Sequence, residues 1–177
     1  VWSHVLANPH FGTVVTENMG GFTWSENSRL NRLSSWSNNA VLDIPSEIIY
    51  LQDKETNKAW SLGLNPMPDE NDYVVTYGFG YANYKHNSNG ILQEVDVFVP
   101  TEDKVKVNIV TLKNIEPVKK NLKLVYYIKP VFGEEELNTR SYINLKFKEQ
   151  ENFIYAKNVY TDLFKNAISY IGCSEKI

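Results

Sequence analysis

The stretch ILQEVDVFVPTEDKVKVNIVTLKN, residues 91–114, alternates apolar and polar side chains on both sides of a short turn. Ile91, Val95 and Val97 fall on one face of its first half, and acidic residues fall on the other. A repeat of two residues is the pattern of a β-strand with one buried face. Residues 100–103, PTED, are of the types that favour turns. The stretch therefore predicts two β-strands separated by a turn.

The second half of this stretch contains one irregularity. Val107 and Ile109 keep the alternation, but the next apolar residue, Val110, falls out of step with them. An extra residue in one strand of an antiparallel pair shifts the phase in this way. We therefore predict a β-bulge near residue 110.

Other segments repeat the two-residue period, and turn residues separate them. Residues 122–128 and 143–148 alternate in the same way, and the polar run 53–58, DKETNK, divides two apolar runs as a hairpin turn does. Roughly ten short strands result, and no segment predicts a long helix. The pattern predicts an all-β, antiparallel sandwich that forms a single domain over residues 1–177.

The segment from residue 161 to residue 173 allows two interpretations. Leu163, Ala167 and Ile171 have the spacing of one face of a helix. We favour a loop followed by a β-strand over residues 167–173, in keeping with the strands before it.

The composition is that of a folded domain, with hydrophobic residues at 42% of 177. The net charge of −3 lacks the basic excess that a phosphate backbone requires, so we expect no nucleic-acid partner. No apolar stretch approaches the ~20 residues of a membrane-spanning helix. The single cysteine, Cys173, excludes an internal disulfide and favours a reducing compartment. We therefore expect a cytoplasmic location.

The usual motifs of catalysis and metal binding are missing from the sequence. His4, His10 and His86 lack the spacing of a metal site, so we expect no metal ion. The glycines in residues 78–80 lack the third glycine of a dinucleotide-binding loop, so we expect no bound cofactor. Residues 134–136 are three glutamates, but consecutive acids in a loop usually face water rather than cleave glycosidic bonds. We therefore assign no catalytic residue in this chain.

One long loop, residues 20–43, concentrates the residue types that bind sugars. Aromatic faces stack on the apolar face of a pyranose ring, while Arg, Asn and carboxylates pair with its hydroxyls. The alternative is a structural loop whose Arg residues cap carbonyl groups and whose Trp residues pack in the core. Composition alone leaves these two interpretations equally open. The candidate substrate-binding residues are Glu26, Asn27, Arg29, Arg32, Trp36 and Asn38.

The segment ANPHFGTVVTENMGGFTWSENSRLNRLSSWSNNAV, residues 7–41, resembles the N-terminal sandwich domain of glycoside hydrolase family 94. That family contains cellobiose and chitobiose phosphorylases, 1,2-β-oligoglucan phosphorylases and cyclic β-1,2-glucan synthases. The resemblance continues through YVVTYGFGYANYKHNSNGI, residues 73–91, and AKNVYTDLFKNAISYIGCSE, residues 156–175, and so covers nearly the whole chain. The sequence departs from the glucan synthase branch at residues 34–35 and 39–40, where the family tends to have Thr-Pro and Asp-Pro.

The resemblance implies a large antiparallel super-sandwich of the galactose mutarotase-like kind. In the family this domain is followed by a helical linker and an (α/α) barrel, which holds the general-acid Asp and the phosphate-binding residues. The resemblance therefore implies that this chain is a truncated part of a longer enzyme and lacks the helical catalytic domain. Inorganic phosphate would be a co-substrate of that enzyme, and a β-glucan oligosaccharide its substrate.

The resemblance also implies a function. The chain would be a non-catalytic, carbohydrate-associated domain that supports the catalytic barrel and its dimer interface, and it would be inactive alone. The whole enzyme would be a glycoside phosphorylase or a glycosyltransferase acting on β-glucans, in the cytoplasm or as the cytoplasmic domain of a membrane-anchored synthase. In family homodimers, loops of this domain approach the neighbouring catalytic pocket, and residues 26–39 correspond to such a loop. Two alternatives stay open: a stand-alone carbohydrate-binding module and a purely structural dimerisation sandwich.

Overall fold

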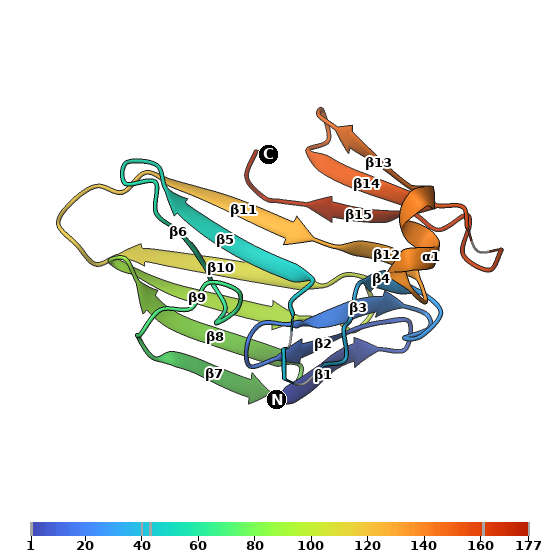
Figure 1. Ribbon diagram of the computed structural model, residues 1–177, viewed down its shortest axis with the longest axis horizontal. Helices are drawn as coiled ribbons and strands as arrows, with labels where there is room; N and C mark the ends of the chain where they lie inside the picture. Colours follow the sequence, from blue (N-terminus) through green and yellow to red (C-terminus); the bar gives the residue numbers. More distant parts are fainter. Residues whose placement is uncertain (1, 40, 43, 161, 177) are drawn as a thin grey trace.

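The computed structural model describes residues 2–39, 41–42, 44–160 and 162–176, and short β-strands make up most of its regular structure (Figure 1). The prediction of an all-β chain is confirmed. In chain order the strands are β1 (Ser3–Asn8), β2 (Phe11–Thr16), β3 (Gly21–Ser25), β4 (Arg32–Ser34), β5 (Glu47–Asp53), β6 (Ala59–Ser61), β7 (Tyr73–Gly78), β8 (Tyr81–Ser88), β9 (Ile91–Phe98), β10 (Val107–Asn114), β11 (Leu122–Ile128), β12 (Pro130–Gly133), β13 (Ile143–Lys148), β14 (Phe153–Asn158) and β15 (Ser169–Gly172).

The described strands pair antiparallel in four sheets. Sheet A has the order β1-β2-β3-β4-β12, sheet B the order β11-β5-β6, sheet C the order β10-β9-β8-β7, and sheet D the order β13-β14-β15. Helical structure in the described residues is limited to α1 (Glu136–Thr139) and a 3-10 turn over Arg140–Tyr142. None of the described helices is long and apolar enough to cross a membrane.

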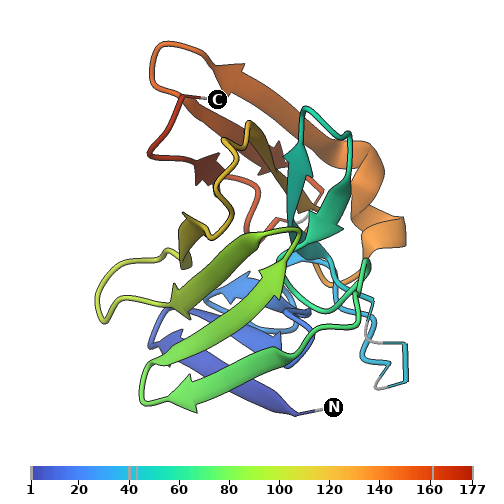
Figure 2. The same cartoon turned by 90° about the vertical axis from the view of Figure 1, so that its left-hand side faces the viewer.

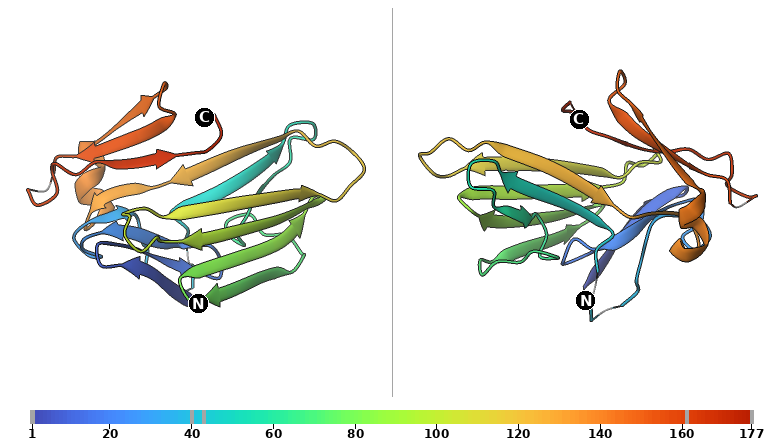
Figure 3. Two further views of the ribbon diagram at one scale, coloured as in Figure 1. Left: turned by 180° about the vertical axis from the view of Figure 1, so that it is seen from behind. Right: turned by 45° about the horizontal axis from the view of Figure 1, so that its top comes forward.

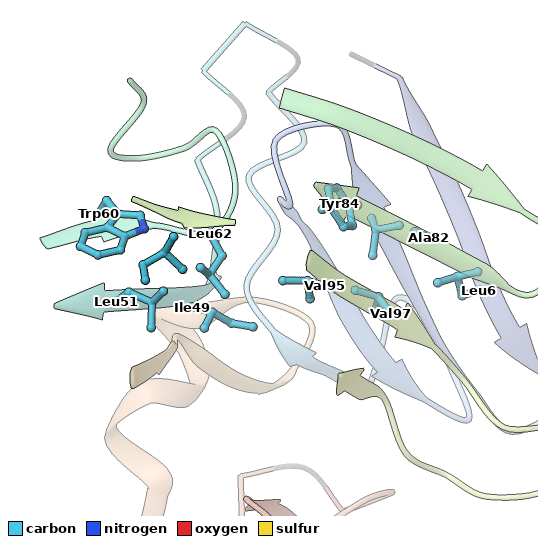
Figure 4. Packing of buried hydrophobic residues seen from close by; sticks show 11 residues of the cluster. Leu6, Ile49, Leu51, Trp60, Leu62, Ala82, Tyr84, Val95 and Val97 are labelled. Carbon is cyan, nitrogen blue, oxygen red and sulfur yellow. The ribbon is translucent and has the colours of Figure 1, made fainter. Parts of the chain in front are cut away.

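The hydrophobic core lies between sheets A, B and C (Figure 4). Strands β5 and β6 face strands β8 and β9 across it, and the β1–β2 hairpin closes one end. These strands supply the core because the inward positions of each are apolar and the outward positions are mostly polar. The buried cluster consists of Leu6, Val15, Ile49, Leu51, Trp60, Leu62, Ala82, Tyr84, Ile91, Val95 and Val97.

One buried polar side chain, Gln93, ties sheet B to sheet C inside this core. Its Oε1 accepts a hydrogen bond from Trp60 Nε1 at 2.9 Å, and its Nε2 donates to the carbonyl of Leu62 at 3.1 Å. Gln93 is 1% exposed, so leaving either group unpaired would cost about 1–3 kcal/mol. The two bonds therefore fix the position of the β6 segment over β9.

The predicted bulge near residue 110 is wrong. Strands β9 and β10 pair in one unbroken register from Val107↔Phe98 to Asn114↔Ile91. Val110 packs against the core, whereas Ile109 points the other way and is 49% exposed. Two adjacent apolar residues thus occupy opposite faces of a regular edge strand. The bulge prediction failed because it rested on the assumption that every apolar residue faces inward.

Two other local predictions are confirmed. The polar run 53–58 does join a hairpin, since β5 and β6 pair with Leu51 opposite Trp60. The end of the chain forms a loop and then strand β15 rather than a helix. The long loop predicted over residues 20–43 is wrong in part, because β3 and β4 lie within it and pair in sheet A. Residue 161 of the C-terminal segment, and residues 40 and 43 of that predicted loop, lie outside the described residues.

Sheet D stands at the opposite end of the molecule from β7 (Figures 2 and 3). One contact between sheet D and the rest is made by Asn158, a buried residue at the end of β14, whose Nδ2 donates to the carbonyl of Phe132 at 3.1 Å. Several of its apolar side chains are exposed, including Leu145 at 58% and Phe147 at 48%. The alternation predicted for residues 143–148 is therefore present, but its apolar face is only partly covered.

A buried carboxylate, that of Glu47 at the start of β5, connects several strands. Its Oε1 accepts hydrogen bonds from Thr23 at 2.6 Å and Ser34 at 2.5 Å. Its Oε2 accepts from Lys106 Nζ at 2.8 Å and from the Tyr126 hydroxyl at 3.0 Å. Burial alone raises the pKa of Glu47, but the Lys106 charge and the donated hydrogen bonds outweigh it and lower the pKa to about 2. The carboxylate is therefore ionised and fully paired.

We expect Glu47 to set part of the acid sensitivity of the fold. Because its folded pKa is below the ordinary value of 4.5, its contribution is complete above that pH and is lost as the pH falls toward 2. The loss amounts to about 3 kcal/mol. Urea unfolding at a series of pH values should show that Glu47→Gln is less stable at neutral pH and has a shallower pH dependence. Asp162→Asn, which alters an exposed ion pair with Lys165, is the control. A wild-type pH slope in Glu47→Gln would contradict the assignment.

Candidate functional site

The loop between β3 and β4 is folded by its own side chains. Asn27 Oδ1 accepts the backbone N–H groups of Arg29 and Leu30 at 2.9 and 2.8 Å, which forms an Asx turn. The buried Asn31 closes the loop, since its Nδ2 donates to the carbonyl of Ser25 at 3.0 Å. The Asn27 side-chain oxygen is thus occupied by the backbone, and the loop has a defined shape that presents its remaining side chains outward.

Arg29 lies on the exposed side of this loop. Its Nε donates to Glu134 Oε1 at 2.7 Å, and the two side chains are 76% and 43% exposed. The hydrogen bond to Glu134 raises the pKa of Arg29. A guanidinium has five N–H donors, and only the Nε–H has a partner within the described residues. Arg29 therefore has donors left for a ligand.

Arg32 is held in a different way, between aromatic rings and carbonyl groups. Its guanidinium carbon lies 5.4 Å from the ring centre of Phe22 and 6.0 Å from that of Trp36, which are cation–π distances. The two rings stack on each other at 4.7 Å. Arg32 Nε donates to the carbonyl of Ser28, and Nη1 to that of Glu134, both at 3.2 Å. These contacts are the ones expected of a structural Arg.

Glu26 connects the loop to sheets A and C. Its carboxylate accepts hydrogen bonds from Lys104 Nζ and, at 3.1 Å, from His10 Nδ1. Lys104 lies between β9 and β10, and His10 lies in the turn between β1 and β2. The bond from Lys104, followed by that from His10, lowers the pKa of Glu26. Glu26 is exposed and ionised, and it presents negative charge at the surface.

The six candidate residues do not form one cluster: Arg32 contacts Trp36 and Asn27 accepts the Arg29 backbone N–H, whereas Glu26 pairs with His10 and Lys104. Asn38 is exposed with a φ of 48°, and no hydrogen bond within the described part of the chain joins it to the other five. Sequence reasoning missed Glu134, Lys104 and His10 as partners of the loop. Glu134 is 43% exposed, as expected of a residue that faces water, but its carboxylate also pairs with Arg29 across 105 residues of sequence. A contact of that separation leaves no signal in local spacing.

A second long loop, residues 64–72, is attached to sheet C through His86. The His86 ring stacks on Tyr73 at 3.6 Å, and its Nδ1 lies 3.0 Å from the carbonyl oxygen of Asp72. Its Nε2 lies 3.1 Å from Asp69 Oδ1, without the alignment of a hydrogen bond. Asp69 in turn accepts a hydrogen bond from the Ser88 hydroxyl at 2.6 Å. Because the carboxylate, not the imidazole, contacts the serine, this group is a loop anchor rather than a nucleophile with its base.

The chemistry available at the 26–39 loop is binding rather than bond cleavage. Exposed Arg29 and Glu26 offer a donor and an acceptor that suit hydroxyl groups, whereas the half-buried ring of Trp36 is contacted by Arg32. The described residues contain no group of three or more His, Cys, Asp or Glu side chains that could hold a metal ion. The small cavity beside Glu47 and Lys106 has room for about one water molecule, which is too little for a sugar.

Comparisons with known proteins agree on one family. The model of the family described as "Glycosyl hydrolase 94, supersandwich domain" matches residues 1–177. The chain is 29% identical over 116 residues to an N,N'-diacetylchitobiose phosphorylase from Vibrio proteolyticus, covering 64% of this chain and 14% of that protein. It is 24% identical over 165 residues to the cyclic beta-(1,2)-glucan synthase NdvB from Rhizobium meliloti, covering 90% of this chain and 6% of that protein. It thus spans less than a fifth of the length of these relatives.

We expect the two arginines of the loop to differ in their effect on stability. Arg32→Ala removes the cation–π contacts and two hydrogen bonds, and should lower the free energy of unfolding by about 1–2 kcal/mol. Arg29→Ala removes one exposed ion pair and should change it by less than about 0.5 kcal/mol. Thermal and urea unfolding of both variants measures this difference. Arg32→Lys, which keeps the charge but loses the planar group, should fall between them. Equal effects of the two alanine substitutions would contradict the described contacts.

Proposed function

This chain belongs to the glycosyl hydrolase 94 supersandwich domain family, and from that premise we propose that it is a non-catalytic domain of a longer, carbohydrate-active enzyme. The observation that carries the proposal is the match of residues 1–177 to this one domain, within relatives that are several times longer. Two of those relatives are named as a phosphorylase and a glucan synthase. The whole enzyme would accordingly act on a β-linked oligosaccharide, with inorganic phosphate as co-substrate if it is a phosphorylase.

In this proposal the 26–39 loop faces the sugar or the catalytic domain. Arg29 supports it, because its exposed guanidinium has one partner within the described residues and keeps its terminal N–H donors for hydroxyl or phosphate oxygens. Arg32 then acts as a positioning residue that keeps Trp36 and the loop in place. The proposal includes a homodimer and a helical catalytic domain as partners, and a cytoplasmic location.

The carboxylates of this loop argue against a catalytic role for the domain. Inverting cleavage of a glycosidic bond needs a carboxylic acid that stays protonated near neutral pH, which requires a raised pKa. The pKa of Glu26 is instead lowered by its hydrogen bonds with Lys104 and His10. Glu134 is paired with Arg29. We therefore assign the chemical step to residues outside this chain.

The competing function is a purely structural sandwich, and one observation favours it. Glu26, Arg29 and Arg32 each have at least one partner inside the chain, as residues of a structural loop would. The two functions differ in what happens when Arg29 is removed. A structural loop tolerates the loss of an exposed pair, whereas a loop that binds substrate does not.

We expect Arg29→Ala, placed in the longer enzyme, to lower kcat/KM for a β-linked oligosaccharide by about tenfold, with an unchanged melting temperature. The 177-residue chain alone should release no sugar phosphate from the same substrate. Lys165→Ala, which alters an exposed pair with Asp162, is the matched control and should keep full activity. Full activity of Arg29→Ala would favour the structural function. Release of sugar phosphate by the chain alone would overturn the non-catalytic assignment.

A further inference from the structure

Sheet C has two unlike faces, and the core uses only one of them. The other face presents two cross-strand pairs in succession, Tyr81↔Phe98 and Asn83↔Asp96, between β8 and β9. Directly opposed residues of this kind have Cβ atoms about 4.5–5.5 Å apart. Strand β7 is the outer edge of this sheet in both views of Figure 3. An aromatic row and a polar row therefore lie side by side at the surface.

The aromatic row is both exposed and fixed in position. Tyr81 is 43% exposed, and Phe79, at the tip of the β7–β8 hairpin, is fully exposed. A Cβ atom at Gly78 would overlap the Tyr81 ring, so the ring lies directly against the backbone there. The glycine thus allows one side of the ring to rest on the strand. Tyr81 is an aromatic surface whose orientation is set before any ligand arrives.

The polar row is built around a buried amide. Asn83 is 8% exposed although it lies on the outer face, and its Nδ2 donates to Glu94 Oε1 at 2.7 Å and to Asp96 Oδ1 at 2.6 Å. Lys85 pairs with Glu94 at 3.0 Å. The bond from Asn83, followed by that from Lys85, lowers the pKa of Glu94, so this carboxylate stays ionised. Each carboxylate is held by one oxygen and keeps a second oxygen as an acceptor.

We infer that this outer face, formed by Tyr81, Phe98, Asn83, Asp96 and Glu94, binds a β-linked oligosaccharide at a site separate from the 26–39 loop. The aromatic rings would stack on the apolar face of a sugar ring, and the carboxylates would accept hydrogen bonds from its hydroxyls. The choice of a β-linked sugar rests on the proposed function. The site itself rests on the side chains.

The balance of hydrogen-bond donors and acceptors on this face favours a neutral ligand rich in hydroxyl groups. Strands β8 and β9 offer carboxylate oxygens on this face and, among their described residues, one lysine, Lys85, which already pairs with Glu94. An anionic ligand would be repelled by Asp96, and a phosphate would lack donors. A neutral ligand rich in hydroxyl groups supplies the missing donors without adding charge. An apolar partner would instead leave Asp96 and Glu94 without water, at a cost of several kcal/mol.

The test is titration of the 177-residue chain with a β-1,2-linked glucose oligomer of about six units, followed by calorimetry and by amide chemical shifts. We expect saturable binding and shifts on the outer face of β8 and β9. Tyr81→Ala and Asp96→Ala should each weaken the affinity by about tenfold or more. Tyr81→Phe, which keeps the ring, and Lys165→Ala, which alters an exposed pair with Asp162, should bind like the wild type. Melting temperatures establish that each variant is folded.

Two results would overturn the inference. One is the absence of saturable binding to the wild-type chain. The other is binding that Arg29→Ala abolishes and that Asp96→Ala and Tyr81→Ala leave unchanged, which would place the sugar at the 26–39 loop and support the proposed function. If Tyr81→Ala does not fold, the affinity of Asp96→Ala and the location of the amide chemical-shift changes decide whether the sugar binds at this face. The two proposals can also separate. If the 177-residue chain binds sugar at β8 and β9, the inference is upheld. If the longer enzyme also keeps its activity with Arg29→Ala, the role proposed for the loop is contradicted.

Discussion

The buried carboxylate of Glu47 is the group on which the arrangement of the sheets depends. Its donors come from β3 and β4 of sheet A, from β11 of sheet B, and from Lys106 just before β10 of sheet C. An ionised group in this position costs several kcal/mol unless all its partners are present. No one of these sheets can satisfy it alone. The carboxylate is therefore fully paired only when all three sheets are in their native arrangement.

The local sequence pattern was enough to predict the strands, but it could not predict the contacts between them. The two-residue period identified the strands of residues 91–114, and the polar run 53–58 identified a hairpin, because both features depend on near neighbours in sequence. The bulge predicted near Val110 failed because Ile109 lies on an outer face of an edge strand, where an apolar residue is tolerated. The partners of Glu47 are up to 79 residues away, so no local pattern predicts them.

In the candidate loop too, the sequence gives the types of residue but not the role of each one. Its composition indicated sugar binding or structure in equal measure, and the two arginines could not be told apart from spacing. In the structure Arg32 lies near the stacked rings of Phe22 and Trp36, while Arg29 extends into solvent toward Glu134. The difference arises from tertiary packing of the loop on β3 and β12. Arg32 thus stabilises the loop, whereas Arg29, in our proposal, binds a ligand, although the two side chains are identical and lie three residues apart.

The anchor of the 64–72 loop has a consequence for how this domain can be observed. The carbonyl of Asp72 can only accept a hydrogen bond, so Nδ1 of His86 must carry a proton while the loop is in place. The nitrogen-15 resonance of Nδ1 therefore depends on this contact with the loop. A single isotope-labelled histidine thus reports, from inside the folded protein, whether this loop is attached.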